Sequence, residues 1–357
     1  MLRLAKEFTI RLLDRDTYRH LLYRRHYHTL LQQRGFGCFR VDGESAYMAQ
    51  WHRLARCVEP YSYRLFSHYC GATSDIVPED ILHRVIEPAL SPQRYWDEYE
   101  DKNNFARIVW AQWLPQTIIC CQRGRMTGSI ENLTACPFPS LILKASMGTS
   151  CGDGILKFDR VGKCYYTPDG LLLSDRLLQN YAPDYVLQEA VCQHPFTAQF
   201  NPTSVNTFRI AAYRSFVDER VHLTAAVLRI GSAGAWVDNA LAGGRYVRVD
   251  MATGVLGATT FTHLGQPSAV WNDIDFSKVD YVVPGWEAVC RLAVHVGEQL
   301  PHARLAALDI ALRQDGSPVL IEYNIGGFSP YFYHFTGQTI FGAYTAEVVD
   351  FCASLRR

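Results

Sequence analysis

The chain of 357 residues carries 35 basic and 35 acidic residues, so its formal net charge is zero. This balance gives no indication of a nucleic-acid partner or of an anionic membrane, and we expect neither. With 48% hydrophobic residues, the composition is that of a folded protein large enough for two or three subdomains. The eleven cysteines show no CxxC spacing, and no signal-peptide core or apolar stretch of ~20 residues is present. We therefore expect reduced thiols, a cytoplasmic location and no transmembrane segment.

Residues 1–95 are predicted to form a mainly helical extension. A run of basic and histidine side chains over residues 19–28 suits either a polyanion or a solvated helix face, and nearby acids favour the solvated face. Further along, Pro78 to Asp80 begins a helix that we expect to end at Pro88, because proline disrupts a helix interior.

Two lysines lie at positions that favour binding of an anion. Lys102 lies near the start of a helix predicted over residues 101–113, where the helix dipole disfavours a cation. Lys144 lies on a strand expected over residues 140–146, which leads into a loop rich in Gly and Ser. Such a loop can bring backbone N–H groups to phosphates beside a lysine, although a plain hairpin turn fits this stretch equally well. The P-loop pattern GxxxxGK[ST] is absent from the chain.

Two further strands carry polar residues. Residues 185–191 include Gln188 and Glu189 on a short strand whose backbone groups could meet a purine edge. Residues 206–214 alternate polar and apolar side chains, which puts Arg209 on the polar face of a half-buried strand. An anion is a plausible partner for that guanidinium.

Residues 305–324 read as a β-hairpin around Asp315-Gly316, a strong signal for a two-residue turn. Counting outward from that turn sets Asp309 opposite Glu322, with Asn324 on the same face. The other face is expected to enter the core through Leu308, Ile310, Leu312, Val319, Ile321 and Tyr323.

Two opposed carboxylates at ~5 Å repel each other by roughly 3 kcal/mol at an effective dielectric of ~20. A divalent cation removes this repulsion, and carboxylate and amide oxygens suit Mg²⁺. The same acids pointing into water would also avoid it, so the hairpin alone leaves both interpretations open.

Taken in order, these pieces resemble the ATP-grasp superfamily from about Trp96 onward. The resemblance rests on Asp101-Lys102, on Lys144 with its small-residue loop, on Gln188-Glu189, on residues 206–209, and on Asp309 with Glu322-Tyr-Asn324. Glu87-Pro88 and the stretch from Gln193-His194-Pro195 to Asn206 are most like the sugar-transfer-associated branch. Each motif is weak alone, whereas several in family order are strong evidence.

The resemblance implies an α+β fold with two subdomains gripping ATP, residues 96–190 and residues 191–357, beyond the 1–95 extension. It implies that Mg²⁺ is held by Asp309, Glu322 and Asn324. It assigns catalysis to Arg209 and Lys144, and a phosphate lid to the 146–154 loop. The nucleotide-binding residues that it implies are Lys102, Lys144, Ser146, Gly148, Gly152, Gly154, Gln188 and Glu189.

The function expected from the resemblance is ATP-dependent ligation of a carboxylate to an amine through an acyl phosphate, in polysaccharide or secondary-metabolite biosynthesis. The partners would be small-molecule carboxylates and amines, sugar-linked ones included. An ATP-dependent phosphotransferase acting on a hydroxyl and a non-catalytic nucleotide-binding partner remain as alternatives. The sequence does not name the substrates or the oligomeric state.

Overall fold

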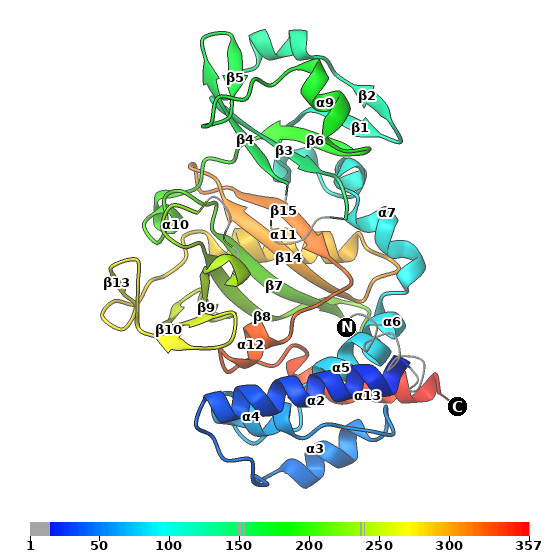
Figure 1. The fold of residues 1–357 in the computed structure, drawn as a ribbon. Helices are drawn as coiled ribbons and strands as arrows, with labels where there is room; N and C mark the ends of the chain where they lie inside the picture. Colours follow the sequence, from blue (N-terminus) through cyan, green and yellow to red (C-terminus); the bar gives the residue numbers. More distant parts are fainter. Residues whose placement is uncertain (1–14, 149–151, 153, 236–237, 239, 357) are drawn as a thin grey trace, which may run out of the picture.

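The computed structural model describes residues 15–148, 152, 154–235, 238 and 240–356. It is built in three layers along one long axis: a smaller sheet at one end, a larger sheet in the middle and a layer of helices at the other end (Figure 1). Helices and antiparallel sheets are thus mixed in one chain, which confirms the predicted α+β class.

The helical layer joins N-terminal helices to the last helix of the chain (Figure 1). Its members are α2 (Arg15–Gln33), α3 (Glu44–Trp51), α4 (Tyr61–Cys70), α5 (Glu79–Ile81), a π-helical turn (Leu82–Ile86), α6 (Glu87–Leu90) and α13 (Thr345–Ser354). The expected helix end at Pro88 is wrong, because the helical path continues to Leu90. In the π turn the Glu87 N–H donates to the Leu82 carbonyl, five residues earlier. The backbone before Pro88 therefore does not follow the i→i−4 hydrogen-bond pattern that a proline disrupts.

Short helical pieces connect this layer to the sheets: 3₁₀ Gln93–Tyr95, α7 (Trp96–Glu100), 3₁₀ Lys102–Asn104, α8 (Phe105–Ile108) and 3₁₀ Ala111–Trp113. The single helix predicted over residues 101–113 is therefore wrong; it is broken by extended backbone at Val109 and Trp110. None of the described helices combines the length and apolarity that a membrane-spanning helix requires.

The smaller sheet has the strand order β2-β1-β6-β3-β4-β5 among the described residues. Its strands are β1 (Thr117–Gln122), β2 (Arg125–Thr127), β3 (Ser140–Ala145), β4 (Leu156–Val161), β5 (Cys164–Tyr166) and β6 (Tyr185–Glu189). One face packs on a 3₁₀ turn (Ile130–Ala135) and on α9 (Asp175–Tyr181) through Leu141, Leu143 and Leu187. The opposite face of β3 is therefore free to present Lys144 toward the larger sheet.

The larger sheet has the described order β11-β10-β9-β8-β7-β14-β15. Its strands are β7 (Thr207–Arg214), β8 (Val221–Ile230), β9 (Arg245–Val249), β10 (Leu256–Thr262), β11 (Pro267–Ser268), β14 (Leu305–Leu312) and β15 (Pro318–Asn324). The amphipathic helix α11 (Trp286–Glu298) buries its apolar side against this sheet (Figure 1). The remaining elements are α10 (Pro195–Ala198), 3₁₀ Ala240–Ala242, β12 (Val270–Trp271), β13 (Ile274–Asp275), α12 (Tyr331–His334) and 3₁₀ Gly342–Tyr344.

The β14–β15 hairpin forms the predicted Asp309–Glu322 pair, but its turn and its register near the turn differ from the prediction. The Arg313 N–H donates to the Ser317 carbonyl at 2.8 Å, which leaves a three-residue loop instead of the expected two. Only Gly316 within this loop has a positive φ (85°), whereas the predicted turn needs two such residues. The pairing near the turn is shifted by one residue, and a bulge at Ile321 restores the Asp309–Glu322 pair.

The bulge also changes which side chains reach the core. Leu320 enters the apolar core beneath the sheet, and Ile321, which was predicted to lie there, lines a cavity instead. Because a strand alternates its faces, one inserted residue is enough to make this exchange.

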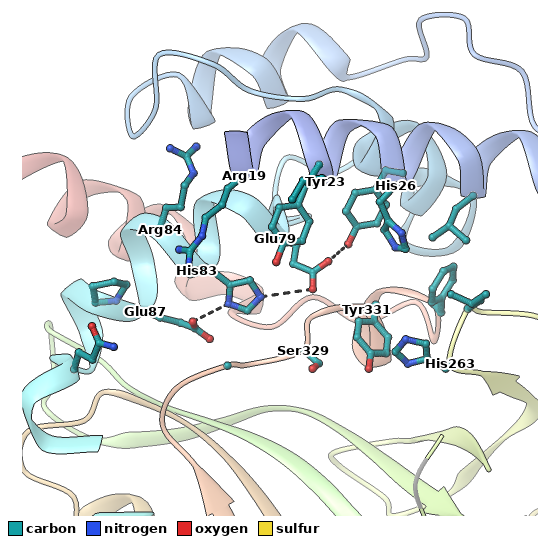
Figure 2. Close-up of a pocket in the computed structure, with 18 of the residues that line it drawn as sticks. Arg19, Tyr23, His26, Glu79, His83, Arg84, Glu87, His263, Ser329 and Tyr331 are labelled. Carbon is teal, nitrogen blue, oxygen red and sulfur yellow. Dashed lines mark hydrogen bonds and ion pairs between the residues drawn. The ribbon is translucent and has the colours of Figure 1, made fainter. Parts of the chain in front are cut away.

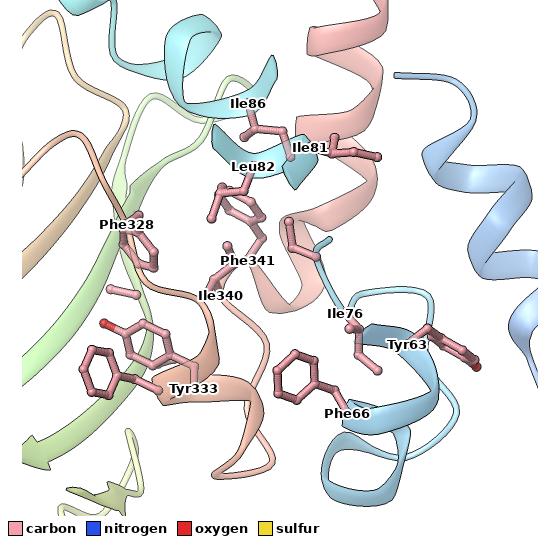
Figure 3. Close-up of a cluster of buried hydrophobic side chains, with 14 of the residues drawn as sticks. Tyr63, Phe66, Ile76, Ile81, Leu82, Ile86, Phe328, Tyr333, Ile340 and Phe341 are labelled. Atoms are coloured by element: carbon pink, nitrogen blue, oxygen red, sulfur yellow. The ribbon is translucent and has the colours of Figure 1, made fainter. Parts of the chain in front are cut away.

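A large hydrophobic cluster joins the helical layer to the larger sheet. Figure 3 shows Phe66 and Ile76 of the first ninety residues in one buried cluster with Tyr333 and Ile340 from the end of the chain, with Tyr63 at the outer side of Phe66. Ala211 and Val227 of strands β7 and β8 belong to the same cluster. The N-terminal helices and the larger sheet therefore share one core.

Candidate active site

A cavity of about 370 Å³ lies between the two sheets, and it brings together most of the predicted site residues. Those that line it are Lys102, Lys144, Gly152, Gln188, Glu189, Arg209, Asp309, Glu322 and Asn324. They come from β3, β6, β7, β14, β15, the short helical turn at residue 102 and, for Gly152, the connection between β3 and β4. Residues separated by more than two hundred positions thus converge on one space.

Three predicted residues lie outside this lining. Ser146 is fully buried, its hydroxyl has no partner among the described residues, and its backbone carbonyl accepts the Lys102 N–H at 3.1 Å. Gly148 and Gly154 have positive φ values, as the turn demands, without lining the cavity. Residues 149–151 and 153 lie outside the described residues, so the lid stays a prediction.

Lys144 points from β3 across the cavity toward the hairpin. Its side chain is almost fully buried, and its Nζ donates to the Ile321 carbonyl at 3.5 Å. Burial, followed by the positive charge of Lys102, lowers the pKa of Lys144 to about 8. A bound polyphosphate would counteract this lowering of the pKa, because its negative charge would lie next to a lysine that has few other anionic neighbours.

We expect nucleotide binding to weaken as the pH rises from 7 to 9. Lys144 is protonated below its pKa of about 8 and neutral above it. Above this pH, binding of an anion must therefore be coupled to uptake of a proton by Lys144. The dissociation constant of an ATP analogue should rise by about tenfold over this range, measured by calorimetry.

The matched variants are Lys144→Arg and Lys157→Ala. The arginine keeps its charge above pH 9 and should flatten the pH dependence, whereas the exposed Lys157 of β4, paired with Asp159 at 3.1 Å, should not change it. An unaltered pH profile in Lys144→Arg would show that another group titrates.

Lys102 and Glu322 face each other at the hairpin. The Lys102 Nζ lies 3.5 Å from a Glu322 oxygen, and Asp101 fixes the turn by accepting the Asn103 N–H at 2.9 Å. The Glu322 side chain remains 36% exposed toward the cavity. An exposed carboxylate with one cation keeps lone pairs available for a further ligand.

A closed network of charges occupies the floor of the cavity. Strand register sets Arg209 beside Asp309, and two hydrogen bonds of 2.9 and 2.7 Å join them. Arg229 of β8 reaches the same carboxylate at 3.1 Å and also pairs with Asp238 at 3.0 Å. Asp238 in turn accepts the Thr207 N–H at 3.0 Å.

The network decides the protonation of Asp309. Burial alone would raise the pKa of this carboxyl, but the Arg209 and Arg229 guanidiniums outweigh burial and hold the pKa below its ordinary value. Asp309 is 2% exposed and ionised. The repulsion expected between Asp309 and Glu322 is thus offset by arginines on one side and by Lys102 on the other.

Sequence reasoning missed Arg229, Val191 and Tyr331 as cavity residues. The face of Arg229 could have been predicted from the pairing of its strand with β7, because Arg229 lies opposite Thr207 and therefore on the same face as Arg209. Val191 follows β6, the strand expected to hold adenine. Because β6 pairs with both β1 and β3, its own backbone groups are used by the sheet, and a purine edge would meet the chain beyond Glu189.

The oxygen donors around Glu322 suit Mg²⁺. The described residues contain no cluster of three or more His, Cys, Asp or Glu, so protein carboxylates alone cannot enclose an ion. Mg²⁺ is commonly held by one or two carboxylates together with substrate phosphates and waters. Glu322 and Asn324 lie two residues apart on the cavity face of β15, and the Asn324 amide nitrogen is buried without a partner among the described residues. This unmet N–H donor fits an acceptor such as a phosphate oxygen, and the amide oxygen remains for a cation.

Among solved structures, the chain is similar to an L-amino acid ligase from Bacillus licheniformis, with 13% identity, 67% of this chain and 43% of that chain covered, and a TM-score of 0.37. It is similar to a D-alanyl-alanine synthetase A from Vibrio cholerae, with 13% identity, coverages of 72% and 64%, and a TM-score of 0.40. A D-cycloserine synthetase shows 12% identity, coverages of 75% and 74%, and a TM-score of 0.42. The chain covers less than two thirds of the length of each of the first two proteins.

No curated protein gives a significant match to this sequence. A family model described as sugar-transfer associated ATP-grasp matches residues 84–329, which is more than half of the chain. The match contains every predicted site residue and every charged residue that lines the cavity between the two sheets. The chain therefore belongs to the sugar-transfer associated ATP-grasp family.

Proposed function

We propose that this protein is an ATP-dependent carboxylate–amine ligase that forms an amide through an acyl phosphate. The observation that carries the proposal is the convergence of four cations and several oxygen donors on one cavity between two sheets. The cations are Lys102, Lys144, Arg209 and Arg229, and the donors are Asp309, Glu322 and Asn324. A cytoplasmic role in polysaccharide or secondary-metabolite biosynthesis belongs to the same proposal.

Phosphoryl transfer needs positioning and charge neutralisation more than covalent chemistry from the protein. In the first step a substrate carboxylate oxygen attacks the γ-phosphorus of ATP, and the bond to ADP breaks. Lys102 and Lys144 offset the charge on the phosphates. Mg²⁺, held by Glu322 and Asn324 beside Asp309, would supply further neutralisation of the phosphate oxygens.

In the second step the amine nitrogen attacks the acyl carbon, the carbon–oxygen bond to phosphate breaks, and the amine proton leaves with the phosphate. Negative charge develops on the acyl oxygen, and a preorganised cation stabilises it. Arg209 suits this role, because Asp309 and the strand register fix its guanidinium in place. Burial opposes the charge on Arg209, but Asp309 raises its pKa, so the group stays cationic.

One assay separates ligation from phosphotransfer. The enzyme, Mg·ATP and a panel of uronic and amino acids are combined with hydroxylamine as a surrogate amine. We expect ADP, free phosphate and a hydroxamate in equal amounts, because hydroxylamine traps the acyl phosphate. A phosphorylated sugar without free phosphate would contradict the proposal and favour the phosphotransferase, and no ADP with any acid would favour a non-catalytic nucleotide binder.

A further inference from the structure

A second cavity, of about 850 Å³, lies between the N-terminal helices and the larger sheet. Helix α2 forms one wall, the helical path from Glu79 to Leu90 forms another, and the turn after β15 closes a third (Figure 2). Ser329 and Tyr331 line both this cavity and the cavity between the two sheets, which we call the ATP-grasp cavity. The two spaces therefore meet at one turn of the chain.

A charged row marks the helical wall of this second cavity. His83 stands between two carboxylates, with its Nδ1 2.8 Å from Glu87 and its Nε2 3.6 Å from Glu79 (Figure 2). Burial works against the charged imidazole, but the two carboxylates outweigh it and raise the pKa of His83 to about 9. His83 is thus charged at neutral pH, and each carboxylate beside it keeps lone pairs for hydroxyl or amine donors.

The other walls add rings and hydrogen-bond donors. Tyr23, Trp96 and Tyr331 line the space, and Arg19 adds a guanidinium above His83 (Figure 2). Burial raises the pKa of Tyr331 to about 12, so its phenol stays protonated and able to donate. The ring of His263 meets Tyr331 with centroids 4.7 Å apart, and its Nδ1 is buried without a partner in the part of the chain that the structure describes. Such an unmet polar atom fits a site that a ligand completes.

Charges of both signs are nearly balanced in the second cavity. His83 pairs with Glu79 and Glu87, Arg19 adds a cation, and Arg84 is paired with Asp80 at 3.2 Å. This balance favours a ligand without strong net charge that offers many hydrogen bonds, such as a polyhydroxylated body. Amphipathic rings cover the apolar faces of such a body while their polar ends reach its hydroxyls.

We propose that the second cavity binds the nitrogen nucleophile as an amino sugar and delivers its amine past Ser329 and Tyr331 to the activated carboxylate. This inference rests on the proposed ligase function. The cavity lies in the upper part of the ~300–1,000 Å³ range of ligand sites, which leaves room for a glycosyl unit. Glu87 also accepts the Phe328 N–H, so the charged row holds the turn that joins the two spaces.

The experiment compares Arg19→Ala, His83→Gln and Arg25→Ala in the full chain. Arg19 and His83 line the second cavity, whereas Arg25 lies exposed on the same helix α2 and does not. Each variant is assayed with glucosamine and with hydroxylamine as the nucleophile. We expect Arg19→Ala and His83→Gln to raise the KM for glucosamine by about tenfold or more and to leave hydroxylamine-supported turnover unchanged. Arg25→Ala should match the wild type with both nucleophiles.

Glucosamine binding, measured by calorimetry without ATP, supplies a second readout. We expect binding to the wild type and at least about tenfold weaker binding to Arg19→Ala, with glycine as the zwitterionic comparison. If the wild type turns over with hydroxylamine but prefers glycine to glucosamine, or if Arg19→Ala slows both nucleophiles equally, the inference fails while the ligase function stands. If the wild type binds glucosamine at Arg19 but releases no phosphate with any acid, the ligase function fails instead.

Discussion

Replacing Glu322 with Gln is expected to lower Mg²⁺-dependent ATP turnover by at least ~100-fold, since even residues behind a metal ligand cost ten- to a hundredfold. Glu322 presents the most accessible carboxylate of the cavity, next to Lys102 and opposite Asp309. The amide keeps the shape of the side chain but removes the charge that would hold a divalent cation. Turnover is measured as ADP release with varied Mg²⁺.

The matched control is Glu287→Gln. Glu287 lies on α11 with its side chain 92% exposed and paired to Arg291 at 3.4 Å, so the same change there should leave turnover at the wild-type level. Thermal unfolding should be similar for both variants, because Glu322 faces the cavity and not the core. Undiminished turnover in Glu322→Gln would remove this residue from the metal site.

The Asp309→Ala variant is expected to lose about 3–5 kcal/mol of unfolding free energy, because it leaves Arg209 and Arg229 buried around a missing charge. The depressed pKa of Asp309 gives the sign of the pH effect. The carboxylate stabilises the fold above about pH 4, the ordinary Asp value, and this contribution is lost as the pH falls through the lower folded-state pKa. Urea unfolding followed by tryptophan fluorescence measures the loss.

Asp350→Ala provides the comparison for this deletion. Asp350 also pairs with an arginine, Arg53 at 2.6 Å, but its side chain is 65% exposed. A surface pair contributes at most about 1 kcal/mol, so this variant should stay close to the wild type. Equal stabilities of Asp309→Ala and Asp350→Ala would mean that water reaches the network and screens it.

Alternation and turn residues were sufficient to predict much of the cavity. Arg209 and the Asp309–Glu322 pair follow from strand periodicity, and Lys144 follows from its place on the strand face opposite the buried Leu141 and Leu143. The hairpin shows the limit of that reasoning: Asp315 does not take the positive φ that a two-residue turn needs, and only the bulge at Ile321 brings Glu322 back opposite Asp309. A bulge is stabilised by packing on both faces of the sheet, which the local sequence does not encode.

The partners of the charged residues could not be predicted in the same way. Arg229 lies eighty residues from Asp309, and the link depends on β7 lying between β8 and β14. The second cavity depends on longer connections still, since it joins His83 to the turn at Phe328. A single sequence contains the residues for such contacts but not the strand order that brings them together.

The hydrophobic cluster that joins the helical layer to the larger sheet bears on how this family should be cut into fragments. The family match covers residues 84–329, whereas the cluster also contains Tyr63, Phe66 and Ile76 before the match and Tyr333 and Ile340 after it. A fragment trimmed to the matching region would lack both of these groups and would leave Ala211 and Val227 of the larger sheet without part of their cover. The region that the family model matches is therefore smaller than the region that shares one core, and expression of the family segment should retain the residues on both sides of it.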